Sequence, residues 1–402
     1  MTWEKFEIRN FVELRQGLAI NKSTQKYLSN EVTYLPLLRI GDMKDGNFNV
    51  FINDSVPEKF IAKESDIIYT RTGKVGLVFR KQYGVIHNNC FTVSSKDESI
   101  LIQEFLYYVL QEKSFYEEAL SRATGAAQPD LPHGAFSSIE IFLPPIDKQK
   151  NIVEILNAYN DLIENNQKQI KLLEEAAQRL YKKWFVDLRF PGYETTPIID
   201  GVPEGWGKKK LVNVFDYVRG KSYSSKEIVD NGKTLLINLK NIRAFGGYNR
   251  NAEKYYIGKY SDSQKLQAGD IVMGVTDMTQ ERRLVGHVAV VPDLGKDMIF
   301  SMDLIKLIPL TVEKSFLYSV MFYGGYSKQI AVLANGTNVL HLKPESMMSM
   351  EMLVPSNEIM SKYDDKFKNF YKKIELLENQ NTILAEARDR LLPKLMSDEL
   401  EV

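Results

Sequence analysis

The chain has 402 residues, more than one hydrophobic core usually organises, so its length predicts two or three domains. Apolar residues make up 44% of the chain and charged residues 26%, which excludes fibrous, collagen-like and wholly disordered proteins. The formal net charge is zero, with 52 basic and 52 acidic residues. A nucleic-acid partner would therefore have to bind a local patch, because the chain as a whole is not basic.

The sequence also predicts where the protein resides. No run of residues approaches the about 18 consecutive apolar positions of a membrane span. The N-terminal residues lack the basic and then apolar pattern of a signal peptide. Cys90 is the single cysteine and has no partner for an internal disulfide. We therefore expect a cytoplasmic protein that does not enter a membrane.

The chain repeats itself once. A segment that begins at Ala123-Thr124-Gly125 and ends at Pro144 aligns, without a gap, with one that begins at Ala334-Asn335-Gly336 and ends at Pro355, at an offset of 211 residues. Each copy ends in a short strand-like run closed by proline. Upstream, similar runs recur at offsets that drift from 199 to 204, which indicates that the globular parts diverged by insertion.

Each copy continues into a heptad seam, in which apolar residues alternate in spacing between four and three. The first seam runs from Ile152 through Asn166 to Trp184, and the second from Tyr363 through Asn381 to Leu395, with a further polar break at Arg388. Each seam predicts a helix of roughly 35 residues, about 50 Å long. The residues expected to pack between the helices are Leu156, Ile163, Asn166, Ile170, Leu173, Leu180, Phe367, Ile374, Leu377, Asn381, Leu384 and Leu391.

These elements predict an α+β protein in which two mixed α/β globular domains are separated by two long antiparallel α-helices. The helices would form a coiled-coil spacer with an internal pseudo-two-fold repeat. The predicted segments are a globular domain at 1–145, a helix at 146–186, a proline- and glycine-rich linker at 187–205, a globular domain at 206–355 and a helix at 356–398. The alternative is two independent helices, each lying on its own domain.

Motifs for catalysis or metal binding do not stand out. Gly220-Lys221-Ser222 lacks the first glycine of a phosphate-binding loop, because Phe215 occupies that position. The four histidines are scattered, without metal-ligand spacing. The sequence therefore predicts a binding protein that is not an enzyme and holds no cofactor or metal of its own.

Several motifs resemble the specificity subunits of type I restriction–modification systems. The run Leu143-Pro144-Pro145-Ile146-Asp147-Lys148-Gln149-Lys150 resembles the family's junction between a target-recognition domain and a conserved helix. The segment from Leu173 to Tyr193 resembles the end of that helix, and Pro203-Glu204-Gly205-Trp206 the entry to the second recognition domain. The order of these motifs, together with the repeat, covers the whole layout.

The resemblance implies a division of labour. Each recognition domain would read one half of a split site in double-stranded DNA, and the helices would hold the two halves apart. From the expected helix length of about 50 Å, we predict half-sites whose centres are roughly one duplex turn apart. Two methyltransferase subunits and restriction/translocase subunits would join the complex, and S-adenosylmethionine, ATP and magnesium would belong to them. The alternatives are a duplicated coiled-coil scaffold that binds nucleic acid or protein without a restriction role, and an enzyme with an unfamiliar site.

Candidate DNA-binding residues are cations, amides, hydroxyls and one tyrosine in predicted loops, because such side chains bind phosphates and base edges. Each of them could instead be an ordinary polar surface residue. They are Arg71, Thr72, Lys74, Arg80, Asn88, Asn89, Gln128, Arg219, Lys221, Tyr223, Lys240, Arg243, Arg282, Arg283 and Asn338.

Four apolar residues of the first helix lie off its main seam, namely Ile155, Leu162, Leu172 and Tyr181. They make the apolar face wider than a two-helix contact needs. We expect them either to receive the methyltransferase or to pack against the chain's own globular domains.

Overall fold

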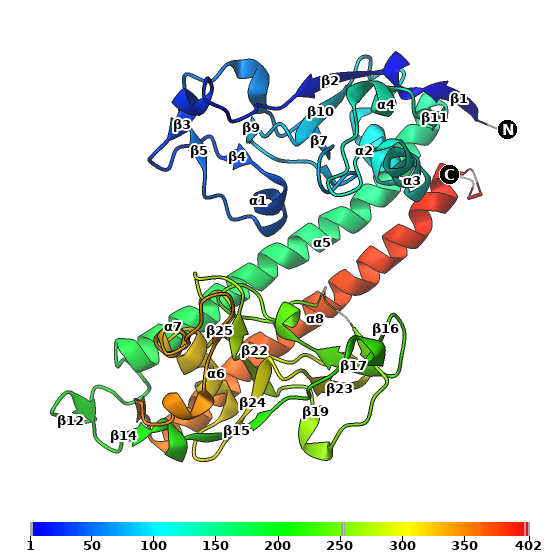
Figure 1. The fold of residues 1–402 in the computed structure, drawn as a ribbon. Helices are drawn as coiled ribbons and strands as arrows, with labels where there is room; N and C mark the ends of the chain where they lie inside the picture. Colours follow the sequence, from blue (N-terminus) through cyan, green and yellow to red (C-terminus); the bar gives the residue numbers. More distant parts are fainter. Residues whose placement is uncertain (1–2, 251, 253, 398, 401–402) are drawn as a thin grey trace. The chain divides into compact units, whose positions relative to one another are not determined.

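The computed structural model describes residues 3–250, 252, 254–397 and 399–400 (Figure 1). These residues form two compact units. The first unit contains the chain up to Asn165 and from Gln380 onward, and the second unit runs from Asn166 to Asn379. Each unit therefore includes part of each long helix, α5 (Ile146–Tyr181) and α8 (Asn357–Met396). Position 398, the predicted end of the second helix, and residues 1–2 of the first predicted domain lie outside the described residues.

The first unit is built on an antiparallel sheet with strand order β2-β10-β7-β8 (Figure 1, blue to cyan). Strand β7 is an unbroken buried run, which is typical of a strand covered on both faces. The α-helices and strands of the unit, α5 and α8 apart, are β1 (Glu4–Glu7), β2 (Val12–Gln16), β3 (Leu28–Ser29), β4 (Leu37–Leu38), α1 (Ile40–Asp45), β5 (Phe51–Ile52), β6 (Ile61–Ala62), β7 (Ile67–Thr70), β8 (Val78–Phe79), β9 (Gly84–Ile86), β10 (Cys90–Ser95), α2 (Gln103–Gln111), α3 (Lys113–Arg122), α4 (His133–Ser137) and β11 (Glu140–Leu143).

The first strand of this unit pairs with its last strand before α5. Strands β1 and β11 are antiparallel, with Glu4 opposite Leu143 and Glu7 opposite Glu140. The chain therefore enters and leaves the globular part of the unit at neighbouring positions. Proline follows β11 directly, at Pro144 and Pro145, and α5 begins at the next residue, where proline ends the strand without interrupting the helix.

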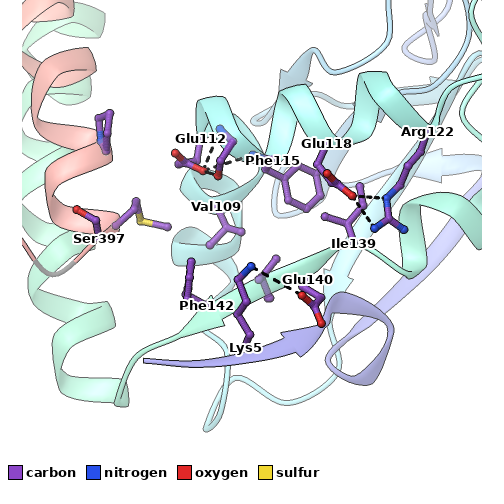
Figure 2. Close-up of a pocket in the computed structure, with 14 residues that line it drawn as sticks. Lys5, Val109, Glu112, Phe115, Glu118, Arg122, Ile139, Glu140, Phe142 and Ser397 are labelled. Atoms are coloured by element: carbon purple, nitrogen blue, oxygen red, sulfur yellow. Dashed lines mark hydrogen bonds and ion pairs between the residues drawn. The ribbon is translucent and has the colours of Figure 1, made fainter. Parts of the chain in front are cut away.

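The core of the first unit joins the sheet and α2 to both long helices. Ile152 and Leu156 of α5 and Leu395 of α8 are almost completely buried in one cluster with Phe105 and Phe136. Beside the last turn of α8 lies an open pocket of about 510 Å³, lined among others by Val109, Phe142 and Met396 (Figure 2). The apolar face of α5 thus begins inside the globular part instead of standing free.

The second unit repeats this plan. Its main antiparallel sheet has the order β15-β24-β20-β22, and β14 pairs with β26 as β1 pairs with β11. The elements of the unit, α5 and α8 apart, are β12 (Ile198–Ile199), β13 (Val202–Pro203), β14 (Gly207–Lys210), β15 (Phe215–Arg219), β16 (Ile228–Val229), β17 (Thr234–Ile237), β18 (Tyr255–Tyr256), β19 (Lys265–Leu266), β20 (Ile271–Gly274), β21 (Thr276–Asp277), β22 (Val288–Val290), β23 (Asp297–Phe300), β24 (Leu304–Pro309), α6 (Lys314–Phe322), α7 (Tyr326–Val332), β25 (Leu340–His341) and β26 (Glu351–Val354).

The core of the second unit is rich in aromatic residues. The end of α5 contributes Tyr181, and Trp184 follows in a π-helical turn (Lys182–Val186). These residues share one cluster with Tyr363 and Phe367, from the first half of α8. The ring centroids of Trp184 and Tyr363 are 5.8 Å apart, and the Tyr363 hydroxyl bonds to Ser319 Oγ of α6 at 2.8 Å.

This buried hydroxyl pair gives a stability prediction. Substitution Tyr363→Phe leaves the buried Ser319 hydroxyl without this partner but keeps the ring in the core. We expect the free energy of unfolding to fall by about 1–2 kcal/mol. Denaturant unfolding of the full chain measures this loss, and Tyr193→Phe, on an exposed tyrosine, is the matched control. Equal unfolding midpoints for the two variants would contradict the expectation.

The predicted helix-packing residues are all at least partly shielded from solvent within their units. Leu156, Asn166, Phe367, Ile374 and Leu377 are buried. The half-buried members are Ile163, Ile170, Leu173, Leu180, Asn381, Leu384 and Leu391. Of the four residues off the seam, Leu162 and Leu172 are exposed, Ile155 is half-buried, and Tyr181 packs in the core of the second unit.

The predicted linker at 187–205 is more ordered than its proline and glycine content suggests. It contains the hairpin of β12 and β13, and Phe190 is buried with its ring centroid 5.0 Å from that of Trp206. The helical turn ends at Val186, before the first proline of the segment, Pro191, and the proline and glycine residues that follow do not prevent the segment from packing on the second unit.

Neither long helix has the apolar composition of a membrane span, and the same is true of every other helix in the described ranges.

Candidate nucleic-acid interface

In the first unit, three loops meet beyond the end of β7. We call residues 71–74, 87–89 and 124–130 the first loop cluster. The Arg71 amide donates to the Asn89 carbonyl at 2.8 Å, and Thr72 forms a β-bridge with Asp130. Six of the predicted DNA-binding residues lie in this cluster, namely Arg71, Thr72, Lys74, Asn88, Asn89 and Gln128.

The first loop cluster is held by Asp130, a residue that sequence reasoning missed. The Arg71 guanidinium donates to both carboxylate oxygens of Asp130, at 2.7 and 3.2 Å, and also to Gln16 at 3.2 Å. The Thr72 hydroxyl donates to the same carboxylate at 2.5 Å. The hydrogen bond from Arg71, followed by that from Thr72, lowers the pKa of Asp130, although partial burial opposes the shift. Arg71 therefore fixes the loops together as well as carrying positive charge.

Two of the predicted DNA-binding residues in the first loop cluster have exposed side chains. Lys74 and Gln128 are exposed, and the Nε2 atom of Gln128 lies 4.0 Å from the position that a Cβ atom would take on Gly73. Gly73 has a φ of +83°, which favours glycine and brings the backbone close to the loop surface. An exposed amide and an exposed amine beside a bare backbone suit contacts to base edges and phosphates.

The second unit has loops at the matching place. We call residues 276–284 and 335–341 the second loop cluster. Thr276 pairs with His341 in the bridge between β21 and β25, and the Gln280 side chain donates to the Thr337 carbonyl at 2.8 Å. His341 and Asp130 are equivalent under the offset of 211, and both pair with a threonine of the opposite loop.

A buried carboxylate organises the second loop cluster. Asp277 has no exposed surface and accepts hydrogen bonds from the amides of Thr279, Leu284 and Val285, at 2.8, 2.6 and 3.2 Å. Burial by itself would raise the pKa of Asp277, but these bonds and that from the Thr279 hydroxyl outweigh it, and the pKa is lowered. The charged Asp277 carboxylate thus accepts the hydrogen bonds that backbone carbonyl groups would accept in a regular helix or strand.

The candidate residues of the second loop cluster differ in their exposure to solvent and in whether they already have an ion-pair partner. Arg282 has a φ of +53° and is half-buried. Arg283 forms an ion pair with Glu281. Asn338 is exposed, and so is Met278, at 79%, an apolar residue that is not among the predicted DNA-binding residues. A flexible apolar side chain at such a place suits contact with a thymine methyl group.

Three further candidates lie at the end of β15. Arg219 pairs with Glu345 at 3.0 Å, and Tyr223 is half-buried against the cluster around Leu236. Lys221 exchanges backbone hydrogen bonds with Phe300 and Met302, at 2.7 and 2.9 Å. Gly220 precedes it, and a Cβ atom there would lie 2.0 Å from the Ser301 carbonyl oxygen, so this close approach requires glycine.

Arg80 and Arg243 are directed at the long helices instead of the loop clusters. Arg80 donates to Asn157 of α5 at 3.2 Å and lies over the Tyr107 ring at 4.5 Å. Arg243 pairs with Glu378 of α8 at 3.2 Å and with Glu174 of α5 at 3.7 Å. Because these cations are already paired at a helix surface, we leave both out of the proposed DNA-binding surface. Lys240 is exposed on a separate loop.

The sequence gives little indication that Asp130 and Asp277 organise the two loop clusters. Asp130 and Asp277 are acidic, and a search for DNA-binding side chains favours cations and amides. The available signal was positional, because Asp130 stands at the place of His341 in the gapless repeat.

Comparison with known proteins places this architecture in a family. The family described as "Type I restriction modification DNA specificity domain" matches residues 1–175 and 203–386, one stretch in each half of the chain. The MjaVIII type I restriction enzyme specificity subunit of Methanocaldococcus jannaschii is 24% identical, over all of this chain and 93% of its own length. The HindI specificity subunit of Haemophilus influenzae is 22% identical, over 84% of this chain and 87% of its own.

A solved structure shares the fold. The S subunit of a type I restriction–modification system from M. genitalium has a TM-score of 0.57 at 16% sequence identity, and the match covers 98% of this chain and 96% of that one. The resemblance drawn from the sequence motifs is therefore confirmed. The chain belongs to the DNA specificity subunits of type I restriction–modification systems.

Proposed function

We propose that the chain reads a split site in double-stranded DNA, with the first loop cluster on one half-site and the second loop cluster on the other. The observation that carries the proposal is the matching pair of bridges, Thr72 with Asp130 and Thr276 with His341. Equivalent loops beside equivalent sheets, with different side chains on them, suit two readers that share a scaffold and recognise different sequences.

The two long helices serve as the spacer between the half-sites. In the first unit the start of α5 contacts the end of α8, and in the second unit the end of α5 contacts the start of α8. This pattern supports an antiparallel pair with an internal pseudo-two-fold repeat. The 36 residues of α5 correspond to a length of about 54 Å, which suits half-sites whose centres are about one duplex turn apart.

The chain itself performs no chemistry in this proposal. Two methyltransferase subunits and the restriction/translocase subunits assemble on it, and S-adenosylmethionine, ATP and magnesium bind to those partners. The support is the family membership and the absence of a nucleophile or phosphate-binding motif in the sequence. Leu162 and Leu172, exposed at 51% and 65%, provide apolar surface on α5 for a partner.

The proposal predicts that each loop cluster controls one half of the methylated motif. Substitutions Gln128→Ala and Asn338→Ala each remove an exposed amide, which reads a base edge through two hydrogen bonds. We expect each to weaken discrimination at one position by about 1–3 kcal/mol, or roughly 5–150-fold. The change should affect the first half-site for Gln128→Ala and the second for Asn338→Ala.

Methylome sequencing of a host that carries the intact system with each variant measures this effect. Arg179→Ala is the control, because Arg179 is 80% exposed on α5 and its ion-pair partner, Glu175, belongs to the same helix and to neither loop cluster. Relaxation of both half-sites by one substitution would contradict the assignment of one cluster to each half. An unchanged motif in both variants would remove these loops from the interface.

A further inference from the structure

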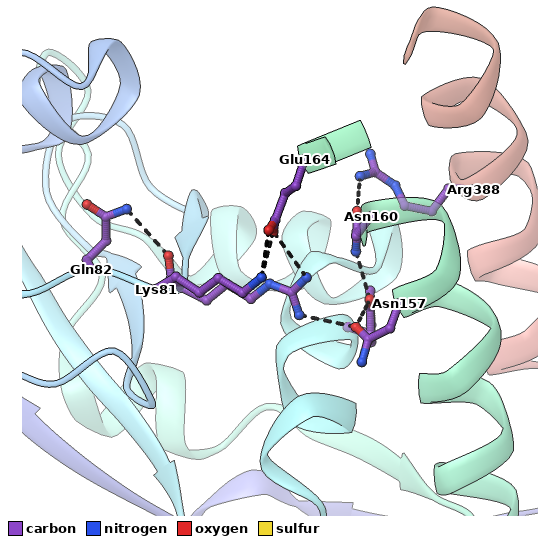
Figure 3. Close-up of polar contacts among 8 residues, drawn as sticks. Lys81, Gln82, Asn157, Asn160, Glu164 and Arg388 are labelled. Carbon is purple, nitrogen blue, oxygen red and sulfur yellow. Dashed lines mark hydrogen bonds and ion pairs between the residues drawn. The ribbon is translucent and has the colours of Figure 1, made fainter. Parts of the chain in front are cut away.

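The contact between α5 and α8 has a different chemical character in the two units. It is polar in the first unit and apolar in the second, at positions that correspond under the offset of 211. In the first unit, Asn160 of α5 is buried and accepts a hydrogen bond from Arg388 of α8 at 2.7 Å (Figure 3). Under the offset of 211, Asn160 corresponds to Tyr371 and Arg388 corresponds to Ala177. In the second unit, Tyr371 and Ala177 line the same small cavity, of about 170 Å³.

Each of these pairs is internally complementary. Asn160 belongs to a polar chain in which its amide donates to the Tyr108 hydroxyl at 2.7 Å, and that hydroxyl donates to Asn157 at 2.7 Å. At the matching place of the second unit, Tyr371 stacks on Phe367 at 5.7 Å and contacts the ring of Tyr318 at 6.0 Å. A long cation meets a small amide in the first unit, and a methyl group meets a large ring in the second.

We infer that these two pairs form a pairing code, by which each half of the chain accepts the helix end of the other half and rejects the helix end of a second copy of itself. If two copies of the first half paired, Asn160 would face Ala177 and its oxygen would lose the arginine. If two copies of the second half paired, Arg388 would face Tyr371 in an apolar cluster. The first mismatch leaves the buried Asn160 oxygen without a donor. The second keeps the Arg388 ion pair with Asp389 but removes the acceptor of its third nitrogen and places the guanidinium among aromatic rings. Such losses are how interfaces discriminate against wrong partners.

The last turns of the two helices also differ, but this difference does not discriminate between the two halves. Gly324 leaves room for Tyr181, because a Cβ atom there would lie 2.4 Å from the Tyr181 hydroxyl and equally close to the Val320 carbonyl. The counterparts under the offset are Lys113 and Leu392. Next to them, Met396 borders an open pocket, whereas its counterpart Phe185 packs 4.8 Å from Tyr363. That pocket would accept either residue, so the discrimination lies at Asn160 and Arg388.

The inference rests on the proposed antiparallel arrangement of the two halves, and its test needs only the purified full chain without DNA. The variant Ala177→Arg with Arg388→Ala swaps the arginine and the alanine between the two helices. Within one chain, Asn160 then faces an alanine and Tyr371 faces an arginine. We expect its Tm to fall by about 5 °C, and a species of doubled mass to appear in light scattering as the concentration rises, because like halves now match. Adding Asn160→Tyr with Tyr371→Asn restores the match within one chain and should recover at least half of the lost Tm.

The control exchanges two exposed residues at matching positions. Leu172→Ile with Ile383→Leu swaps side chains that are 65% and 66% exposed, and it should leave the Tm and the mass unchanged. A fall in Tm that Asn160→Tyr with Tyr371→Asn does not recover would show a merely structural role and overturn the code. An exchange variant with unaltered Tm and mass would overturn it as well.

If the exchange variant is insoluble, a double-mutant cycle tests whether Asn160 and Arg388 stabilise the chain through their contact with each other. Asn160→Ala and Arg388→Ala should each lower the Tm, and the double variant should lose clearly less than the sum of the two single losses, since both changes remove the bond between these two residues. Additive losses would overturn the inference. Failure of the code leaves the half-site experiment with Gln128 and Asn338 unaffected, so the two outcomes are distinguishable.

Discussion

Removing one heptad from each long helix should shorten the spacer of the methylated motif by about three base pairs. Deletion of residues 166–172 and 381–387 removes one heptad from each helix, in each case beginning at the seam asparagine, and neither heptad carries any of the ion pairs described between the globular parts and the helices. Seven residues correspond to about 10 Å of helix, and DNA rises by 3.4 Å per base pair. A complete heptad keeps the same helix face toward its partner, so the seam remains in register.

The measurement is methylome sequencing of a host carrying the system with the shortened chain. We expect methylation of the original motif to fall by more than about 100-fold, since a misplaced half-site loses several base contacts of about 1–3 kcal/mol each. The control keeps the length and changes the exposed Lys171 and Glu386 of the same heptads to alanine. A shortened chain that still methylates the original spacing would show that helix length does not set the gap.

Substitution Asp277→Ala should cause the largest loss of any single change in the loops. It leaves the amides of Thr279, Leu284 and Val285 without their common acceptor. We expect the free energy of unfolding to fall by about 2–4 kcal/mol. Recognition of the second half-site should fail, because its loops lose their anchor. Circular dichroism during denaturant unfolding measures the stability, and a binding assay on a duplex carrying the wild-type motif measures recognition.

The charge of Asp277 also sets a pH dependence. Its pKa is lowered in the folded chain, so the stabilisation is complete above the ordinary carboxyl range and is lost as the pH falls through the lowered value. The difference in stability between the wild type and Asp277→Asn should therefore shrink below about pH 4. Asp262→Ala removes a carboxylate that is 94% exposed and is the matched control. An equal loss in that variant would assign the effect to surface charge.

The regular parts of this fold could be predicted because their patterns are long. The seam from Ile152 to Trp184 spans more than four heptads, and α5 with the turn that follows it covers Ile146 to Val186. Short strands joined by loops carry no such redundancy. The order of the segment at 187–205 escaped prediction because one buried residue, Phe190, fixes a stretch whose composition indicates a free linker.

The loop clusters were predictable in place but not in detail. The sequence around Arg71 and around Arg282 predicts loops that could bind DNA, because cations and hydroxyl groups are concentrated there, with a glycine close by. The partner that holds Arg71, however, is Asp130, which lies 59 residues away in the chain. Arg80 and Arg243 have the same composition signal and are directed at the helices. Only tertiary structure separates a cation that fixes a helix from one that faces solvent.

The pairing of β14 with β26, and of β1 with β11, makes each globular part a cassette with adjoining ends. A segment whose two ends lie side by side can be exchanged for another without moving the helices that flank it. Recombination at Trp206 and Pro355 would therefore join a different globular part to the same long helices. A chain could acquire a new DNA target in one step, without a change in the sequence of α5 or α8.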